Sequence, residues 1–238
     1  MGLKEFLGVY PEFLRSGRLE NFEGIEVCAR VDELMDKLIF PAAESPVVVL
    51  LRVNSRCLFM EAVNIALTGH RMSLICILRA ALESACYAYQ IRVNPDDAAA
   101  WVDRSRDEES RKKCRKVFGP SVKVVSKHFD NVYPDHKGLI EDSYNSLIDY
   151  GAHPSHLAIS MSVDVEESED SYNVNFNILG GAGVEWGVFS CFQIGLICAW
   201  LMIDFDSQRE ELKSTMDELI SMVRSWRDSL NEKTGSGS

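Results

Sequence analysis

Residues 71–95 read RMSLICILRAALESACYAYQIRVNP, and this stretch decides the fold class. From Leu74 to Tyr89 the segment is apolar on nearly every face of a helix, interrupted chiefly by Arg79 and Glu83. A helix without a polar face must be surrounded by protein. We therefore expect this helix at the centre of an all-α protein, a bundle of several helices.

Helical periodicity continues on both sides of this central segment. Apolar residues recur at helical spacing, and prolines or glycines stand near the ends of the periodic stretches. The predicted helices cover residues 19–40, 46–70, 95–119, 121–129 and roughly 134–153. Segment 95–119 is rich in charged residues, so we expect it to form one exposed helix.

The period of the pattern changes after residue 160. Both SMSVDVEES (160–168) and YNVNFNIL (172–179) alternate as strands do, and EDS between them supplies turn residues. The pattern predicts one β-hairpin at about 161–179, inserted into the helical protein. The GGAG at 180–183 ends it.

The segment WGVFSCFQIGLICAWLMI, residues 186–203, contains no charge and is close to membrane-spanning length. Gln193 lies inside it, acidic residues flank it, and no Lys or Arg is adjacent, which argues against a membrane span. We predict a buried core helix and no membrane association. Gly183 and Gly187 have the small-xxx-small spacing that permits close helix approach.

The last predicted helix, at 207–231, opens with Ser207 and Glu210 at capping-box spacing. Its apolar residues follow a 4-3-4-3-4 spacing that is typical of a coiled-coil seam: Leu212, Met216, Leu219, Val223, Trp226 and Leu230. This seam needs a partner helix, either within the chain or from a second subunit. We expect the chain to form a homo-oligomer, specifically a homodimer.

The composition and charge of the chain limit the cellular compartments and the classes of ligand that we expect for it. Seven cysteines without a CxxC indicate reduced thiols in a cytoplasmic protein and make a cysteine zinc site improbable. The first 16 residues lack the pattern of a signal peptide, and the terminal GSGS (235–238) is typical of a linker, which leaves one helical domain over 1–234.

One segment departs from the acidic character of the chain. The net charge of −11 does not steer the whole chain toward nucleic acid. Residues 104–127 nevertheless carry nine basic residues against three acidic ones. Such a local basic segment could hold the phosphates of RNA.

Two charged residues of the central helix are the first candidates for a site. Arg79 and Glu83 lie four residues apart and project from the same side. Charges in an apolar setting are costly unless they are paired. The pair could bind each other, or charged residues of the preceding helix such as Arg52, Arg56 and Glu61. Alternatively, they form a polar constellation that meets a residue of another helix, such as His153.

His153 is the second candidate, because Pro154 should end its helix there. A histidine at a helix C-terminus is favoured in its protonated form, and Asp149 would strengthen this effect. His153 could therefore act as an acid or base near neutral pH. On the helical wheel it lies away from the apolar arc, which indicates a rim or cleft position.

The sequence gives weaker support to a metal site, a nucleophilic serine or a phosphate-binding loop. Asp149, His153 and His156 could bind a metal, but the proline breaks the helix that would align them, and no HExxH is present. Ser155 lacks a nucleophile-elbow context, and GGAG lacks the lysine and spacing of a phosphate-binding loop. We expect no cofactor.

Two of these segments resemble HEPN-like proteins, a broad group of bacterial all-α domains. The resemblance lies in ILRAALESACYAYQI (77–91) and in YNSLIDYGAHPSHLAIS (144–160), and it covers roughly residues 47–205. It implies a bundle of four or five helices, frequently dimeric, with the two motif helices facing each other. Active members are metal-independent ribonucleases of toxin–antitoxin and phage-defence systems.

The resemblance carries over to some site residues and not to others. His153 matches the histidine of the family's R-x(4–6)-H motif, and Glu83 matches the polar residue of the earlier helix. The arginine positions hold Ser146, Leu147 and Ile148, although Arg79 could substitute in space.

Three functions follow from these observations. The favoured one is a non-catalytic binding or oligomerisation module, in bacterial defence or toxin–antitoxin regulation, with an unknown protein partner. The second is a divergent metal-independent ribonuclease using His153, with Glu83 or Arg79 orienting it and RNA on 104–127. The third is a metal- or small-molecule-dependent enzyme at Asp149, His153 and His156.

Overall fold

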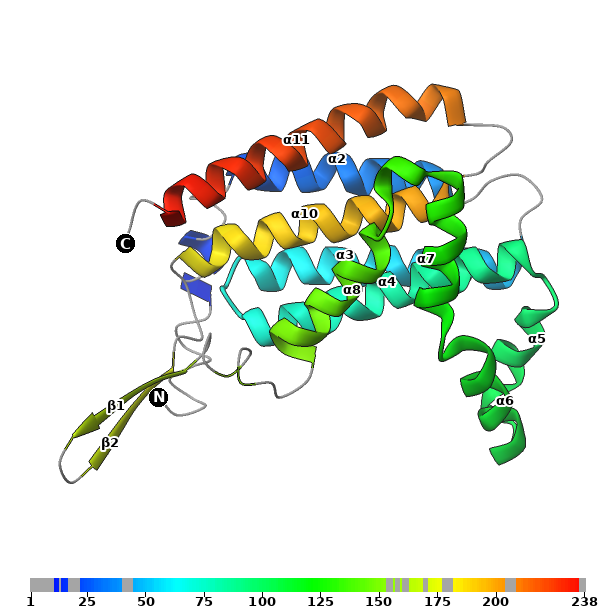
Figure 1. Cartoon of the computed structure of the whole chain (residues 1–238), viewed down its shortest axis with the longest axis horizontal. Helices are drawn as coiled ribbons and strands as arrows, with labels where there is room; N and C mark the ends of the chain where they lie inside the picture. The colour runs from blue at the N-terminus through cyan, green and yellow to red at the C-terminus, as the bar shows by residue number, and fades with distance from the viewer. Residues whose placement is uncertain are drawn as a thin grey trace.

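The computed structural model of the chain is a bundle of helices, which confirms the predicted all-α class (Figure 1). It describes residues 11–12, 14–16, 22–39, 45–152, 156, 159, 163–168, 171–176, 182–203 and 209–235. His153 and Ser207 lie outside these residues. All seven cysteines are free thiols and five are buried, as in Cys28, where burial raises the pKa to about 12.

The centre of the bundle is a pair of helices, α3 (Pro46–Ala66) and α4 (Arg71–Val93), covered by α10 (Ala182–Met202). The turn between α3 and α4 uses Gly69 at φ 81°, a left-handed conformation that favours glycine. Helix α2 (Phe22–Ile39) packs against α10 and α3. In Figure 1, α10 lies between α2 and α11 above and α3, α4 and α8 below.

Helix α10 is more deeply enclosed than α4. Within the described residues, these two helices are long and apolar enough to cross a membrane by length and composition. The most apolar window of α10 is 78% buried inside the bundle, against 50% for that of α4. The prediction of a buried core helix at 186–203 is therefore confirmed.

Small residues let α10 approach its neighbours. A Cβ atom at Gly187 would lie 3.1 Å from the Leu74 side chain and 3.2 Å from the Cβ of Ala66. A Cβ at Gly195 would overlap the ring of Phe59. The close approach expected at Gly187 thus occurs, within the bundle and against both central helices.

Helix α11 (Arg209–Gly235) places its apolar seam on the bundle itself. Four seam residues are buried, namely Met216, Leu219, Val223 and Leu230. Trp226 lies against the rings of Phe189 and Phe192 of α10, and Arg30 of α2 forms an ion pair with Glu218 at 2.7 Å. The sequence left open whether the seam packs within the chain or against a second subunit. In the structure, helices of the same chain supply its partner.

The single helix predicted at 95–119 is wrong. The segment forms α5 (Asp97–Val102), the 3-10 turn η1 (Asp103–Ser105) and α6 (Glu108–Phe118). Asp107 interrupts the helix because its backbone is extended and its side chain accepts a hydrogen bond from the backbone N–H of Ser110 at 2.7 Å. Such capping starts a new helix at Glu108.

The helix predicted at 134–153 is also divided. Following α7 (Ser121–Val132), the chain forms the 3-10 turn η2 (Pro134–His136), α8 (Leu139–Leu147) and the π-helical turn η3 (Ile148–Ala152). Gly138, at φ 83°, separates η2 from α8. The widened turn η3 packs against α4. A continuous helical wheel over 134–153 is therefore not valid.

Two short strands, β1 (Val163–Ser168) and β2 (Ser171–Phe176), form an antiparallel pair in which Val163 faces Phe176. They extend from the lower left of the bundle in Figure 1, opposite α5 and α6.

Candidate functional site

Arg79 and Glu83 form a pair on α4, as one of the two interpretations predicts. Arg79 Nε donates a hydrogen bond to Glu83 Oε1 at 3.0 Å. The two side chains are 27% and 30% exposed, so the pair lies at the edge of the bundle and not inside it. Arg52 instead donates to the Leu38 carbonyl, and Arg56 binds Asp32 and Asp36 of α2.

Tyr144 of α8 completes this cluster. Its hydroxyl donates to the same Glu83 Oε1 at 2.8 Å, and the Arg79 guanidinium lies 5.2 Å from the centre of its ring. Tyr144 is not among the site residues that the sequence predicts. No local signal in the sequence could have found it, because Tyr144 and Glu83 are 61 residues apart and meet only when α8 docks on α4.

The pKa shifts of Tyr144 and Arg79 favour a neutral tyrosine and a charged arginine. Burial and the hydrogen bond to Glu83 raise the pKa of Tyr144. Burial alone would lower the pKa of Arg79, but the hydrogen bond and charge of Glu83 outweigh it and raise this pKa. The cluster is therefore a salt bridge with an aromatic cover that ties α8 to α4.

The other predicted site residues do not join this cluster in the described structure. Asp149 and His156 are both exposed, and His153 lies outside the described residues. Across the residues that are described, no group of three or more His, Cys, Asp or Glu side chains could hold a metal ion. The metal site predicted at Asp149, His153 and His156 stays a prediction, because His153 lies outside the described residues.

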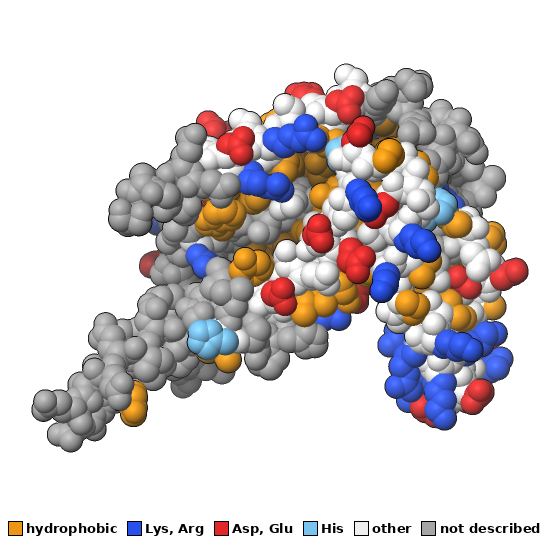
Figure 2. All heavy atoms as spheres, viewed as in Figure 1, with side chains coloured by type: hydrophobic (Ala, Val, Ile, Leu, Met, Phe, Trp, Pro, Cys, Tyr) orange, Lys and Arg blue, Asp and Glu red, His pale blue; other side chains and the backbone are white. Residues whose placement is uncertain are grey.

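The segment 97–118, comprising α5, η1 and α6, forms a projection that we call the basic arm. It extends from the lower right of the bundle in Figure 1, and Figure 2 shows blue side chains gathered over it. Helix α6 buries one narrow stripe, made of Ser110, Cys114 and Phe118. Glu108 and Glu109 are exposed in its first turn, and its other five exposed positions are basic: Arg111, Lys112, Lys113, Arg115 and Lys116.

Part of this positive charge is balanced within the arm. Glu108 accepts hydrogen bonds from Arg111 at 3.0 Å and from Arg115 at 3.1 Å. Arg106 pairs with Asp103 and Asp107. Three lysines of α6 form no ion pair with any described residue, namely Lys112, Lys113 and Lys116.

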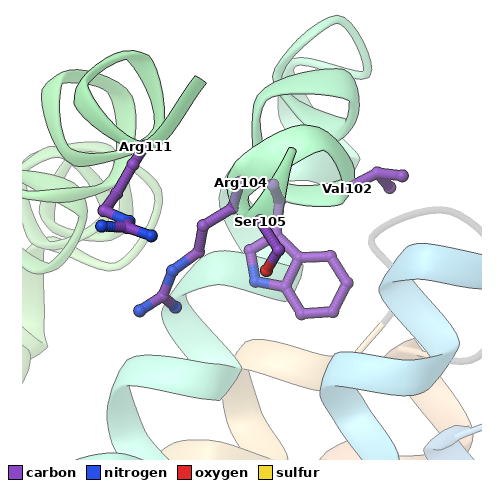
Figure 3. Close-up of a pocket in the computed structure, with 5 residues that line it drawn as sticks. Val102, Arg104, Ser105 and Arg111 are labelled. Atoms are coloured by element: carbon purple, nitrogen blue, oxygen red, sulfur yellow. The ribbon is translucent and has the colours of Figure 1, made fainter. Parts of the chain in front are cut away.

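A pocket of about 440 Å³ opens at the base of the arm, lined by Trp101, Val102, Arg104, Ser105 and Arg111. Figure 3 shows Arg111 extending from α6 toward the same space as Arg104, while Val102 points away from both. The pocket thus combines an indole, a hydroxyl and two guanidinium groups. Its residues come from both sides of the break at Asp107.

The arm is anchored to α4 through a small second core. Tyr87 lies 4.7 Å from Phe118, centre to centre, and Trp101 packs against the same group of apolar residues. The buried amide of Gln90 donates hydrogen bonds to Asp97 at 2.8 Å and to the Val117 carbonyl at 3.3 Å. These contacts fix both ends of the arm, so its charged tip has a defined position.

Comparisons of the chain with protein-family models, with curated proteins and with solved structures found no match. The HEPN-like assignment therefore stays a prediction.

Proposed function

We propose that the chain is a non-catalytic helical binding module and that its basic arm binds RNA. The observation that carries the proposal is a cluster of basic side chains on a projection of a chain whose net charge is −11. Local positive charge attracts phosphates and releases their counterions. The chain outside the arm carries a net negative charge and would repel a strand that bound elsewhere.

The polar cluster on α4 supports a structural role for Glu83 over a catalytic one. A general base needs a carboxylate or imidazole that can accept a proton from a substrate. Oε1 of Glu83 already accepts two hydrogen bonds, from Arg79 and Tyr144. This arrangement is typical of a structural ion pair that joins two helices.

Several expectations from the sequence belong to this proposal. We propose that the protein acts in the cytoplasm as a homodimer of HEPN-like type, with the hairpin at about 161–179 as an insertion into one helical domain. Bacterial defence or toxin–antitoxin regulation is the role that the resemblance implies.

The test compares charge reversal on the arm with charge reversal elsewhere. The arm variant changes Lys112, Lys113 and Lys116 to Glu, and the control makes the same change at three exposed basic residues of other elements, Lys37, Lys137 and Arg227. Both variants have the same net charge. RNA affinity is measured as a function of salt concentration.

We expect the arm variant to lose affinity and the control to bind nearly as the wild type does. Each phosphate of a single strand that a protein neutralises adds about 0.7 to the slope of log K against log salt, so the slope of the arm variant should be shallower by about 2. Wild-type protein that fails to bind RNA at low salt, or equal effects in both variants, would contradict the proposal.

A cleavage assay tests the ribonuclease alternative directly. Purified wild-type protein and His153→Ala are incubated with RNAs of varied sequence, with and without chelator. We expect the RNA to stay intact. Cleavage that resists chelator and disappears in His153→Ala would replace the binding proposal with a metal-independent nuclease.

A further inference from the structure

The pocket at the base of the arm has the chemistry of a site for an unpaired nucleobase. We propose that it binds one base of single-stranded RNA stacked on Trp101, with the neighbouring phosphates held by Arg104 and Arg111. This inference rests on the proposed function, since it requires a strand along the arm. It adds to that function a defined binding site and a preference for unpaired bases.

Trp101 supplies the stacking surface. The indole packs on the second core on one side and lines the pocket on the other, and it is partly exposed. Aromatic rings that are fixed in this way bind any base through its flat face. A core residue alone would not need two arginines and a serine beside its exposed side.

The two arginines are placed to hold the phosphates next to the base. Arg111 is oriented by its hydrogen bond to Glu108, and Arg104 forms no ion pair among the described residues. Figure 3 shows that both side chains extend into the same space. The planar guanidinium group matches the geometry of phosphate oxygens and binds them in a bidentate manner.

The shape of the pocket favours a single strand. Its volume of about 440 Å³ is in the range of small-ligand pockets and suits one base that is splayed out. Bases within a duplex are paired and stacked and cannot enter such a pocket. An acidic peptide could use the positive charge of the arm but would have no flat group for the indole.

The experiment separates the base from the phosphates. The affinity of the full chain is measured for a short oligoadenylate and for an abasic ribose-phosphate strand of the same length. Trp101→Ala is compared with Tyr150→Ala, a control that removes an exposed aromatic side chain outside the pocket and the arm.

We expect wild-type protein to bind oligoadenylate about tenfold more tightly than the abasic strand, as the energy of one stacked base predicts. Trp101→Ala should abolish this difference and Tyr150→Ala should keep it. Equal wild-type affinity for both strands would overturn the inference and leave the proposed function intact. Binding of neither strand, or of an acidic peptide in preference to both, would overturn both.

A crosslinking measurement covers the case in which Trp101→Ala loosens the arm. Wild-type protein is irradiated with an oligonucleotide that carries 5-iodouracil, and the crosslinked peptides are identified by mass spectrometry. The inference predicts a crosslink at Trp101. Crosslinks confined to segments outside 97–118 would overturn it.

Discussion

A single carboxylate oxygen determines how α8 meets α4. Oε1 of Glu83 accepts from a residue one turn earlier on its own helix and from Tyr144 on another. The i, i+4 spacing of Arg79 and Glu83 made the first contact predictable, because such pairs are neighbours on any helix. The second contact, from Tyr144, depends on how α8 docks on α4. The periodicity of the sequence carries no information on this docking.

Tyr144→Phe tests the importance of this contact. The variant keeps the ring beside Arg79 and removes one hydrogen bond to a charged group at the edge of the bundle. We expect unfolding free energy to fall by about 1 kcal/mol. Denaturant unfolding followed by circular dichroism measures the change, and Tyr150→Phe is the control, because the Tyr150 side chain is exposed. Equal effects of the two changes would contradict a specific role for Tyr144.

At the scale of elements, the small residues of α10 decide how closely the central helices pack. They recur every four residues, at Gly183, Gly187, Cys191, Gly195 and Ala199, and so lie along one face of the helix. The sequence showed the spacing of the first two glycines. It did not show which helices would pack against them, because any helix without a bulky side chain at the contact would satisfy the pattern.

Gly195→Ala should destabilise the protein although alanine has the higher helix propensity. The added Cβ would overlap the Phe59 ring in a closely packed region, and overpacking of this kind costs about 1–3 kcal/mol. Thermal unfolding measures the decrease in stability. In the double variant Gly195→Ala, Phe59→Leu, the smaller side chain should recover part of this lost stability. If the destabilisation of the double variant equals the sum of the two single effects, the Phe59 ring is not the cause.

The break between α5 and α6 shows what a local signal can and cannot predict. Asp107 is followed by two glutamates, and this sequence is typical of a helix start. The charge pattern on both sides of it nevertheless resembled one continuous exposed helix. The pocket lies across the break, so the error in secondary structure also concealed the Trp101 site.

At the scale of the whole molecule, the class of the fold was predictable and the docking of its helices was not. Residues 71–95 and 186–203 are too apolar for any position but a protein interior or a membrane, and this indicates a helical bundle. The seam of α11 could equally serve a second subunit. Only the three-dimensional structure shows that α2 and α10 already cover it.

Val223→Asp should therefore unfold the chain and not merely separate subunits. Val223 is buried within the core that α11 closes, and a carboxylate there loses apolar burial and its hydration together. We expect unfolding free energy to fall by about 3 kcal/mol or more. Denaturant unfolding and analytical ultracentrifugation are measured together. A stable, fully folded monomer of Val223→Asp would show that the seam belongs to a dimer interface instead.

The position of α10 in the chain has a consequence for biosynthesis. This helix contacts α2, α3 and α4, yet a ribosome that has completed α4 must still translate residues 94–181 before α10 begins. The nascent chain therefore holds three helices whose shared apolar surface has no cover. Such surfaces bind chaperones or one another while translation continues. The central layer of the core can therefore form only late, after α10 leaves the exit tunnel and before α11 covers it.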